Sequence, residues 1–230
     1  MKTIGLIGGI TPESTILYYR ILNELSSKQF GGSHSCKLII NSVDFEEIVK
    51  LQKSGRWDIL NTIMADAAIS LEKAGASYIL ICANTMHLTI DAVRESVSIP
   101  IVHIAEATAK QIVHKKLSTV ALLGTKYTME NTFFIDVLKK HGIKTIIPDE
   151  NDRQIVHDVI YDELSKGVLN PDSKQSYLKI IQKLIDTGAE GVILGCTEIP
   201  LLILQDDVNV PTFDTTTIHA TEVFKLALNE

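Results

Sequence analysis

The sequence predicts an α/β fold made of two similar halves, each containing a parallel sheet. Short apolar, β-branched segments alternate with longer amphipathic ones, which is the pattern of strands joined by helices. A second observation is an internal repeat: Gly75–His87 aligns without a gap with Gly188–Pro200 at a shift of 113 residues. A third is that Thr3–Gly8 resembles Thr119–Gly124 at a shift of 116 residues.

The repeat indicates two doubly wound, pseudo-symmetric domains. We expect residues 1–103 plus 211–230 to form the first domain, and residues 104–210 to form the second. In parallel sheets, ligands bind beyond the carboxyl ends of the strands. A polar loop follows a strand end in each half, and the sequence therefore predicts an active site in a cleft between the two domains.

Helix-capping residues divide the chain into its expected elements. Thr11, Asn170 and Asp214 are expected N-caps, with proline following the first two, and Gly167 is expected to stop a helix. Strands are expected at residues 3–7, 36–43, 76–82, 99–103, 118–123, 144–147, 191–194 and 208–213. Helices are expected at residues 12–30, 45–53, 57–74, 85–97, 105–115, 129–141, 149–166, 171–187 and 197–205, and a closing helix after Asp214 is expected to contain residues 218–226.

Composition excludes several classes of protein. The chain has 230 residues, a formal net charge of −6, 45% hydrophobic residues and 22% charged residues, as in ordinary globular enzymes. The acidic balance and scattered basic residues argue against a nucleic-acid partner. No apolar run has transmembrane length, and we expect neither a membrane partner nor a signal peptide. An odd set of three cysteines without paired spacing suggests the reducing cytoplasm.

Cofactor and metal motifs are not found in the sequence. Gly5-Leu-Ile-Gly8-Gly9 is not a G-x-G-x-x-G fingerprint, and Asp44 lies too far along the chain to be its acidic partner, so NAD or FAD is not expected. The seven histidines are dispersed without metal-ligand spacing. The glycines instead suggest that a small anion approaches backbone N–H groups where the helix after Thr11 begins.

Cys196 is the leading candidate for a reactive group. It follows the apolar segment Gly191–Leu194, and Thr197 could cap a helix with Glu198 in its first turn. At the positive end of a helix dipole a thiol loses its proton more easily. The alternative for a lone cysteine after a core strand is a small, buried and unreactive side chain.

Together, these motifs resemble the aspartate/glutamate racemase family, most closely its broad-specificity amino-acid racemase branch. The resemblance covers nearly the whole chain and rests on five motifs in family order. They are Gly8-Gly9-Ile-Thr-Pro-Glu13-Ser14-Thr15, Asn84-Thr85-Met86-His87, Gly124-Thr125-x-x-Thr128-Met129-Glu130, Lys166-Gly167 and Leu194-Gly-Cys196-Thr197-Glu198.

The resemblance implies a two-domain racemase that needs no cofactor and is commonly a homodimer. One residue would remove the α-proton of an amino acid or other small carboxylate, and another would deliver a proton to the opposite face. Cys196 would be the principal acid/base, and hydrogen bonds would stabilise the carbanion. The implied substrate-binding residues are Ile10, Gln52, Asn84, Thr85, Thr125, Thr128, Lys166, Thr197 and Glu198. Without the resemblance, Gln52 looks like a surface residue, and Lys166 could equally be a solvated helix end.

The first half departs from the family pattern at one position. Family members carry Cys or Thr directly before Asn84-Thr85, whereas this chain has Ala83, the position that the repeat aligns with Cys196. Cys82 is one residue earlier, and its side chain should point to the other face of the strand. The second acid/base could be Cys82 after a bulge or a register shift, a water or Thr85, or Ala83 could be an engineered substitution. Otherwise the protein is a one-cysteine carbanion enzyme, such as a decarboxylase or isomerase of a related acid, or an inactive carboxylate-binding protein.

Overall fold

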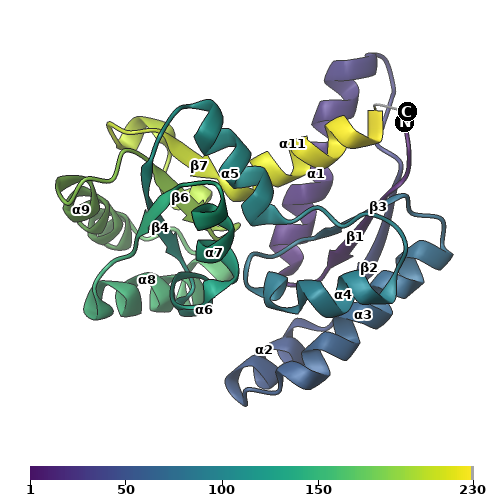
Figure 1. Cartoon of the computed structure of the whole chain (residues 1–230), viewed down its shortest axis with the longest axis horizontal. Helices are drawn as coiled ribbons and strands as arrows, with labels where there is room; N and C mark the ends of the chain where they lie inside the picture. Colours follow the sequence, from purple (N-terminus) through teal and green to yellow (C-terminus); the bar gives the residue numbers. More distant parts are fainter. Residues whose placement is uncertain (229–230) are drawn as a thin grey trace. The chain divides into compact units, whose positions relative to one another are not determined.

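The computed structural model describes residues 1–228. The chain forms two compact units, one made of Met1–His103 and the segment that starts at His219, the other of Ile104–Ile218. Each unit has one parallel sheet accompanied by helices (Figure 1). This confirms the predicted α/β class with two parallel sheets. In the described part of the chain, no helix combines the length and apolar character needed to cross a bilayer.

The first unit contains a three-stranded sheet with the order β2-β1-β3. The helix α1 begins as predicted: Thr11 accepts a hydrogen bond from the Ser14 amide at 3.1 Å, and Pro12 is its first residue. The elements are β1 (Ile4–Gly8), α1 (Pro12–Phe30), β2 (Leu38–Ser42), α2 (Phe45–Lys53), α3 (Trp57–Lys73), β3 (Tyr78–Ile81), the 3₁₀ helix η1 (Thr85–Thr89), α4 (Ile90–Ser96) and most of α11 (Thr215–Leu228).

Alternate side chains of the first sheet enter two separate cores. Leu6 and Leu80 pack with Tyr18 of α1 and with the apolar side of α11. Ile7 and Ile81 point to the opposite face and pack with α2, α3 and α4. A sheet that is covered on both faces has strands that are apolar throughout, as β1 and β3 are.

The second unit has a four-stranded parallel sheet with the order β5-β4-β6-β7. Leu123 and Leu194 pack against α8 and α9, whereas Leu122 and Ile193 pack against α5 and α7. The elements are α5 (Ile104–His114), β4 (Thr119–Gly124), α6 (Lys126–Glu130), α7 (Thr132–Lys140), β5 (Lys144–Ile146), α8 (Glu150–Asp162), η2 (Leu164–Lys166), α9 (Pro171–Asp186), β6 (Val192–Gly195), α10 (Ile199–Leu202), η3 (Gln205–Asp207) and β7 (Thr212–Asp214).

Several expectations differ from the structure. The strand expected at residues 99–103 is only a single bridge between Ile101 and Ile79, next to Pro100, which has no N–H to donate. The helix expected at 129–141 is interrupted at Asn131, whose extended backbone separates α6 from α7. Residues 211–230 were expected in the first domain, but β7 pairs with β6 and extends the second sheet.

The helix expected at residues 85–97 begins instead as a 3₁₀ turn. The Thr89 hydroxyl donates to the Met86 carbonyl at 2.7 Å, and the His87 ring nitrogen Nδ1 lies 2.8 Å from the Ala83 carbonyl. Side chains that bond local carbonyls compete with the α-helical hydrogen bonds. The regular helix α4 therefore starts only at Ile90.

Two buried histidines join α11 to the first sheet. His219 lies between Tyr18 and the Val102 carbonyl: Nδ1 is 2.9 Å from the Tyr18 hydroxyl, and Nε2 is 2.8 Å from that carbonyl. The ring of His87 lies 5.5 Å from that of His219. Burial, reinforced for His87 by the charge of Arg94, lowers the pKa of His87 to about 4; burial and His87 lower the pKa of His219 to about 3.

These neutral histidines should make the fold sensitive to acid. Their pKa values are below the ordinary 6.5, so between pH 6.5 and about 4 the unfolded chain binds more protons than the folded one. The free energy of unfolding should therefore decrease as the pH is lowered through this range, by about 1.4 kcal/mol per pH unit for each histidine. We expect a shallower slope for His219→Gln in urea unfolding between pH 7.5 and 4.5. Equal slopes for the two proteins would contradict this assignment.

Candidate active site

The strands β4 and β6 bring two polar loops to the same edge of the second sheet. They are hydrogen-bonded neighbours, and Gly124 pairs with Gly195, so Thr125 and Cys196 both follow the last pair of this ladder. A Cβ at Gly195 would lie 2.7 Å from the Leu123 carbonyl, and one at Gly124 would lie 2.8 Å from the Gly195 carbonyl. Glycine at both positions therefore permits the close approach of the strand ends.

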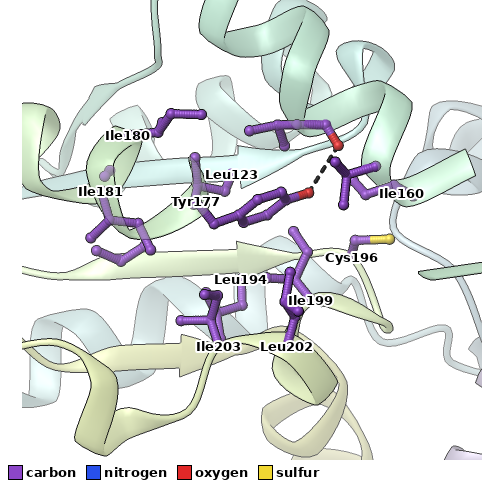
Figure 2. Close-up of a cluster of buried hydrophobic side chains, with 14 of the residues drawn as sticks. Leu123, Ile160, Tyr177, Ile180, Ile181, Leu194, Cys196, Ile199, Leu202 and Ile203 are labelled. Carbon is purple, nitrogen blue, oxygen red and sulfur yellow. Dashed lines mark hydrogen bonds between the residues drawn. The ribbon is translucent and has the colours of Figure 1, made fainter. Parts of the chain in front are cut away.

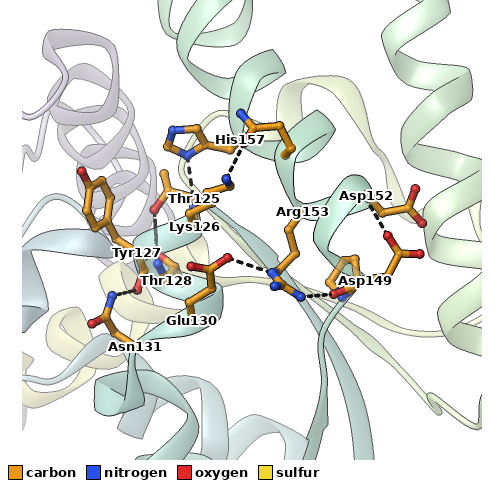
Figure 3. Close-up of polar contacts among 12 residues, drawn as sticks. Thr125, Lys126, Tyr127, Thr128, Glu130, Asn131, Asp149, Asp152, Arg153 and His157 are labelled. Atoms are coloured by element: carbon orange, nitrogen blue, oxygen red, sulfur yellow. Dashed lines mark hydrogen bonds and ion pairs between the residues drawn. The ribbon is translucent and has the colours of Figure 1, made fainter. Parts of the chain in front are cut away.

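The threonines after β4 are held in fixed positions. Thr125 caps α6 by accepting from the Thr128 amide, and the two hydroxyl oxygens are 3.3 Å apart. Figure 3 shows how α6 is joined to α8: the Lys126 amide donates to His157 Nδ1 at 3.2 Å, and Arg153 donates to Glu130 at 2.9 Å. The structure thus places Thr125 and Thr128, both predicted from the sequence, directly after β4. The helix here begins at Lys126, whereas the sequence predicted Met129 as its first residue.

Cys196 is hydrogen-bonded to Glu198 two residues later. The thiol donates to Glu198 Oε2 at 2.9 Å, and the Thr197 hydroxyl donates to the same oxygen at 2.6 Å. Cys196 lies at the end of the core cluster that contains Leu194 and Ile199, and its sulfur points away from the other side chains (Figure 2). The residue is 9% exposed, so it is nearly but not completely enclosed.

The electrostatics of Cys196 are opposite to those expected from the sequence. Burial raises the pKa of the thiol well above its ordinary value, and the charge of Glu198 raises it further. Thr197 does not cap a helix: its hydroxyl is directed to Glu198, and α10 has only four residues. The expectation that the start of a helix lowers the pKa of this thiol is therefore wrong. Cys196 is a protonated thiol that donates to a carboxylate.

Two tyrosines near Cys196 were not identified from the sequence. Tyr161 of α8 and Tyr177 of α9 both have their phenol pKa values raised, mainly by burial and then by the negative charge that Cys196 carries when it is ionised. Tyr177 donates to the Val156 carbonyl at 2.9 Å, while the ring of Tyr161 packs at a tilt against His157, with the ring centroids 4.7 Å apart. The spacing of four residues between His157 and Tyr161 put both on one side of a helix and could have drawn attention to them.

In the first unit, the strand register identifies the counterpart of Cys196. Ile7 pairs with Ile81, and the next amide, that of Cys82, donates to the Ile7 carbonyl at 3.0 Å. Cys82 thus occupies the place that Gly195 has in the second sheet, and Ala83 occupies the place of Cys196. The structural comparison of the two units agrees with the repeat in the sequence.

Cys82 and Ala83 enter different cores of the first unit. Cys82 is 0% exposed and packs with Leu6, Tyr18 and Leu80. Burial raises the pKa of its thiol far above the ordinary range. Ala83 lies on the other side of the sheet, in the cluster that contains Ile7.

The remaining candidates of the first unit lie around Ala83. Ile10 belongs to the same apolar cluster as Ala83 and Met86. Gln52, which the sequence alone suggested to be on the surface, is buried, and its amide lies 3.3 Å from the Met86 sulfur. Asn84 and Thr85 directly follow Ala83, and both are buried.

Gly8 and Gly9 allow close packing of the chain at the carboxyl end of β1. A Cβ at Gly8 would lie 2.5 Å from the Thr15 methyl carbon, and one at Gly9 would lie 2.2 Å from the Val43 carbonyl. The Gly9 amide donates to the Thr15 hydroxyl at 2.8 Å, and the Ser14 amide is bonded to Thr11. The sequence suggested that an anion approaches the amides at this helix start. The Gly9 and Ser14 amides, however, already donate hydrogen bonds to threonine side chains.

Lys166 is not buried with the other candidates. It ends η2, its side chain is 62% exposed, and it lies 3.7 Å from Asp162. Gly167 follows in the left-handed conformation, as expected for the residue that stops a helix. Among residues 1–228, no group of three His, Cys, Asp or Glu side chains is arranged to hold a metal ion.

Comparison with known proteins agrees with this arrangement of strands and polar loops. Residues 7–223 match the family model described as Asp/Glu/Hydantoin racemase. The chain belongs to this racemase family.

Relatives of the chain cover almost its full length. The broad-specificity amino-acid racemase RacX of Bacillus subtilis is 24% identical, with 92% of each chain covered. The crystal structure of a protein from Yersinia pestis, described as a putative Asp/Glu racemase, has a TM-score of 0.93 and 46% identity, and covers 100% of both chains. An aspartate racemase homologue from Pyrococcus horikoshii has a TM-score of 0.87 and 40% identity, with 99% of each chain covered.

The contact between Cys196 and Glu198 predicts how the thiol reacts. Glu198→Gln removes the negative charge that raises the pKa of the thiol, so Cys196 should be alkylated by iodoacetamide faster at pH 8. Mass spectrometry of the labelled peptides would follow the reaction at each cysteine. Glu150→Gln removes the same charge from an exposed position of the same unit and should leave the rate unchanged. Unchanged labelling in Glu198→Gln would contradict the assigned role of the carboxylate.

Proposed function

We propose that the protein is a cofactor-independent amino-acid racemase in which Cys196 exchanges a proton with the α-carbon of the substrate. The observation that carries this proposal is the hydrogen bond of 2.9 Å from the Cys196 thiol to Glu198. An amino acid has a weakly acidic α-hydrogen, and its removal needs a base held at the reacting carbon. A thiolate is such a base once its own proton has been accepted by a neighbour.

Glu198 is the proposed acceptor of that proton. Cys196 is protonated at rest, because burial and the nearby carboxylate raise its pKa. In the forward step the proton moves from the sulfur to Glu198, and the sulfur then takes the α-proton, leaving a carbanion. In the reverse direction the thiol returns a proton to carbon, and Glu198 gives its proton back to the sulfur. The carboxylate thus adjusts the protonation of Cys196 without a change in net charge.

Neutral hydrogen-bond donors are the proposed binding groups for the substrate carboxylate. Thr125, Thr128 and Thr197 come from the second unit, and Asn84 and Thr85 from the first. Hydroxyl and amide donors stabilise the extra charge of the carbanion when they are held in place and water is excluded. Ile10, Gln52 and Lys166 stay in the proposal as further substrate contacts, Lys166 with its exposed ammonium group as the least enclosed of them. That the two strand ends act on one substrate stays a prediction.

The second proton donor is the open part of the proposal. Ala83, at the position equivalent to Cys196, has no ionisable group, and Cys82 is enclosed in an apolar core that disfavours its thiolate. We therefore favour Thr85 or a water as the donor on the opposite face.

The three cysteines are free thiols, which agrees with a reducing compartment such as the cytoplasm.

Ala83 also favours a second candidate function. With one ionisable thiol the protein would protonate a carbanion on one face only, as in the decarboxylation or isomerisation of a related acid. Such an enzyme would release CO₂ from an α-substituted malonate, or would give a single enantiomer as product. A racemase would instead interconvert the two enantiomers of an amino acid. An inactive protein would bind a carboxylate, seen as a raised melting temperature, without turnover of any substrate.

Exchange of the α-proton in deuterated water tests the principal role of Cys196. Incubation with aspartate, glutamate or other amino acids should introduce deuterium at the α-carbon, measured by mass spectrometry and chiral chromatography. Cys196→Ser should lower the rate at least about a thousandfold, because the hydroxyl is a far weaker acid and base. Cys36→Ser is the matched control, since Cys36 is buried just before β2, at the amino ends of the strands, where Leu38 pairs with Ile4. Exchange that persists in Cys196→Ser would refute the proposal.

Introducing an ionisable group at position 83 tests whether the site lacks a proton donor on one face of the substrate. Ala83→Cys should raise the rate of inversion relative to the rate of exchange, by about tenfold or more, because a general acid on the second face typically contributes about 10²-fold or more. Cys82→Ala should leave both rates nearly unchanged. A large loss on Cys82→Ala, in a protein with unchanged circular dichroism, would instead identify Cys82 as the second acid/base.

A further inference from the structure

The helix α6 begins with two of the proposed substrate contacts but is too short to hold its own position. It has five residues, and Thr125 is its N-cap. Helices this short are not stable in isolation, so their conformation depends on contacts with the rest of the chain. The first amides of a helix also lack an acceptor within it. The positions of Thr125 and Thr128 therefore depend on the groups that bind the first turn of α6.

His157 of α8 supplies an acceptor to this turn. The amide of Lys126, the first residue of the helix, lies 3.2 Å from Nδ1 of His157 (Figure 3). An amide N–H can only donate, so Nδ1 carries the lone pair and the neutral ring has its proton on Nε2. The Thr125 hydroxyl accepts from the Thr128 amide in the same turn. His157 and Thr125 together thus bind two of the amides at the start of α6.

Two tyrosines hold the imidazole of His157 in place. The ring centroid of His157 lies 4.7 Å from that of Tyr161 of α8 and 6.3 Å from that of Tyr127 of α6. His157 is half-buried beside them. Contacts with two large rings restrict the rotation of the side chain, so Nδ1 stays directed at the start of α6.

We propose that His157 is a positioning residue for the reaction: its neutral imidazole holds the start of α6, and with it the hydroxyls of Thr125 and Thr128, in the arrangement that binds the substrate carboxylate. This role rests on the proposed racemase function, in which the two threonines are substrate contacts. Protonation puts a hydrogen on Nδ1, which then can no longer accept a hydrogen bond. The first turn of α6 therefore loses this acceptor in acid.

The surroundings of His157 set the pH at which this change occurs. Burial lowers the pKa of His157 below the ordinary 6.5. The charge of Asp158 on α8 opposes the shift, and that of Lys126 on α6 adds to it. Glu130 of α6 and Asp162 of α8 oppose it as well. His157 is therefore neutral at pH 7, and the affinity for the substrate should decline only as the pH falls below 6.5.

The other end of α6 is bound by a group that does not titrate near neutral pH. Arg153 of α8 donates to Glu130 at 2.9 Å and to the Pro148 carbonyl at 2.7 Å. Arginine stays protonated at any pH used for proteins. Protonation of His157 should therefore loosen the first turn of α6 without detaching the helix, so the effect falls on substrate binding and not on the fold.

An NMR titration of isotope-labelled protein between about pH 8 and about pH 5.5 tests the hydrogen bond without any substrate. The amide proton of Lys126 should change its chemical shift with the same midpoint as the His157 ring, and this midpoint should lie below 6.5. In His157→Asn the side-chain oxygen takes the place of Nδ1 as acceptor and does not titrate, so the Lys126 signal should stay constant. His114→Asn, the same substitution at an exposed position of the second unit, should titrate as the wild type does.

The kinetics of α-proton exchange test the consequence for substrate binding. For aspartate or glutamate, whichever exchanges faster, KM of the wild type should rise as the pH falls below the midpoint of His157, and more strongly than kcat falls. His157→Phe keeps a ring but removes the acceptor, so its KM should be raised about tenfold throughout this range. His157→Asn should keep a low KM that no longer rises in acid, and His114→Asn should follow the wild type.

Different results would overturn different parts of the inference. A Lys126 signal that does not follow the titration of His157 would refute the hydrogen bond. A KM unaffected by His157→Phe, or a rise in acid that persists in His157→Asn, would refute the positioning role while the racemase function stands. If neither amino acid exchanges its α-proton with the wild type, the proposed function and the positioning role fall together. Circular dichroism at each pH separates these effects from acid unfolding.

Discussion

The parallel register of paired strands is the constraint on which the candidate site depends. Each strand of a parallel pair ends at the same edge of the sheet, so the residues that follow paired positions are neighbours however far apart they lie in sequence. Gly124 and Gly195 are such a pair in the second sheet, and their lack of a Cβ lets the chains turn away at the same level. The threonines after β4 and the cysteine after β6 reach the same edge for this reason.

Within that edge, opposing effects determine the chemistry of Cys196. Enclosure by Leu194, Ile199 and neighbouring apolar side chains disfavours a charged sulfur. Glu198 disfavours it further, yet its carboxylate is also within hydrogen-bonding distance to take the proton. In the proposed mechanism, transfer of the thiol proton to Glu198 keeps the net charge of the pair constant, which suits a nearly enclosed site where a net change in charge would be costly.

Much of the fold could be predicted from the sequence because its signals are local. The threonine, proline and acid at the start of α1, and the asparagine and proline before α9, satisfy amide groups within a few residues. The repeat gave the equivalence of Ala83 and Cys196, and strand register supports the same pairing. The parts that were missed depend on contacts between segments distant in sequence: β7 beside β6, and the buried amide of Gln52 against Met86.

The candidate site was less predictable for the same reason. A helix start after Cys196 was expected because Thr197 is a good capping residue, but the nearby carboxylate of Glu198 binds that hydroxyl instead. Tyr161 and Tyr177 come from α8 and α9, and only tertiary packing brings them near the sulfur. Sequence patterns thus supplied the candidate residues, whereas the direction of the pKa shift of Cys196 needed the three-dimensional surroundings.

The enclosure of the thiols has a consequence for oxidative damage. Peroxide attacks the thiolate form of cysteine and converts it to sulfenic acid. Burial raises the pKa of Cys36 to about 11, and the pKa values of Cys82 and Cys196 are raised as well, so little thiolate exists in the resting protein near neutral pH. Thiols that stay protonated at rest can persist through oxidative stress that would modify a permanently ionised cysteine.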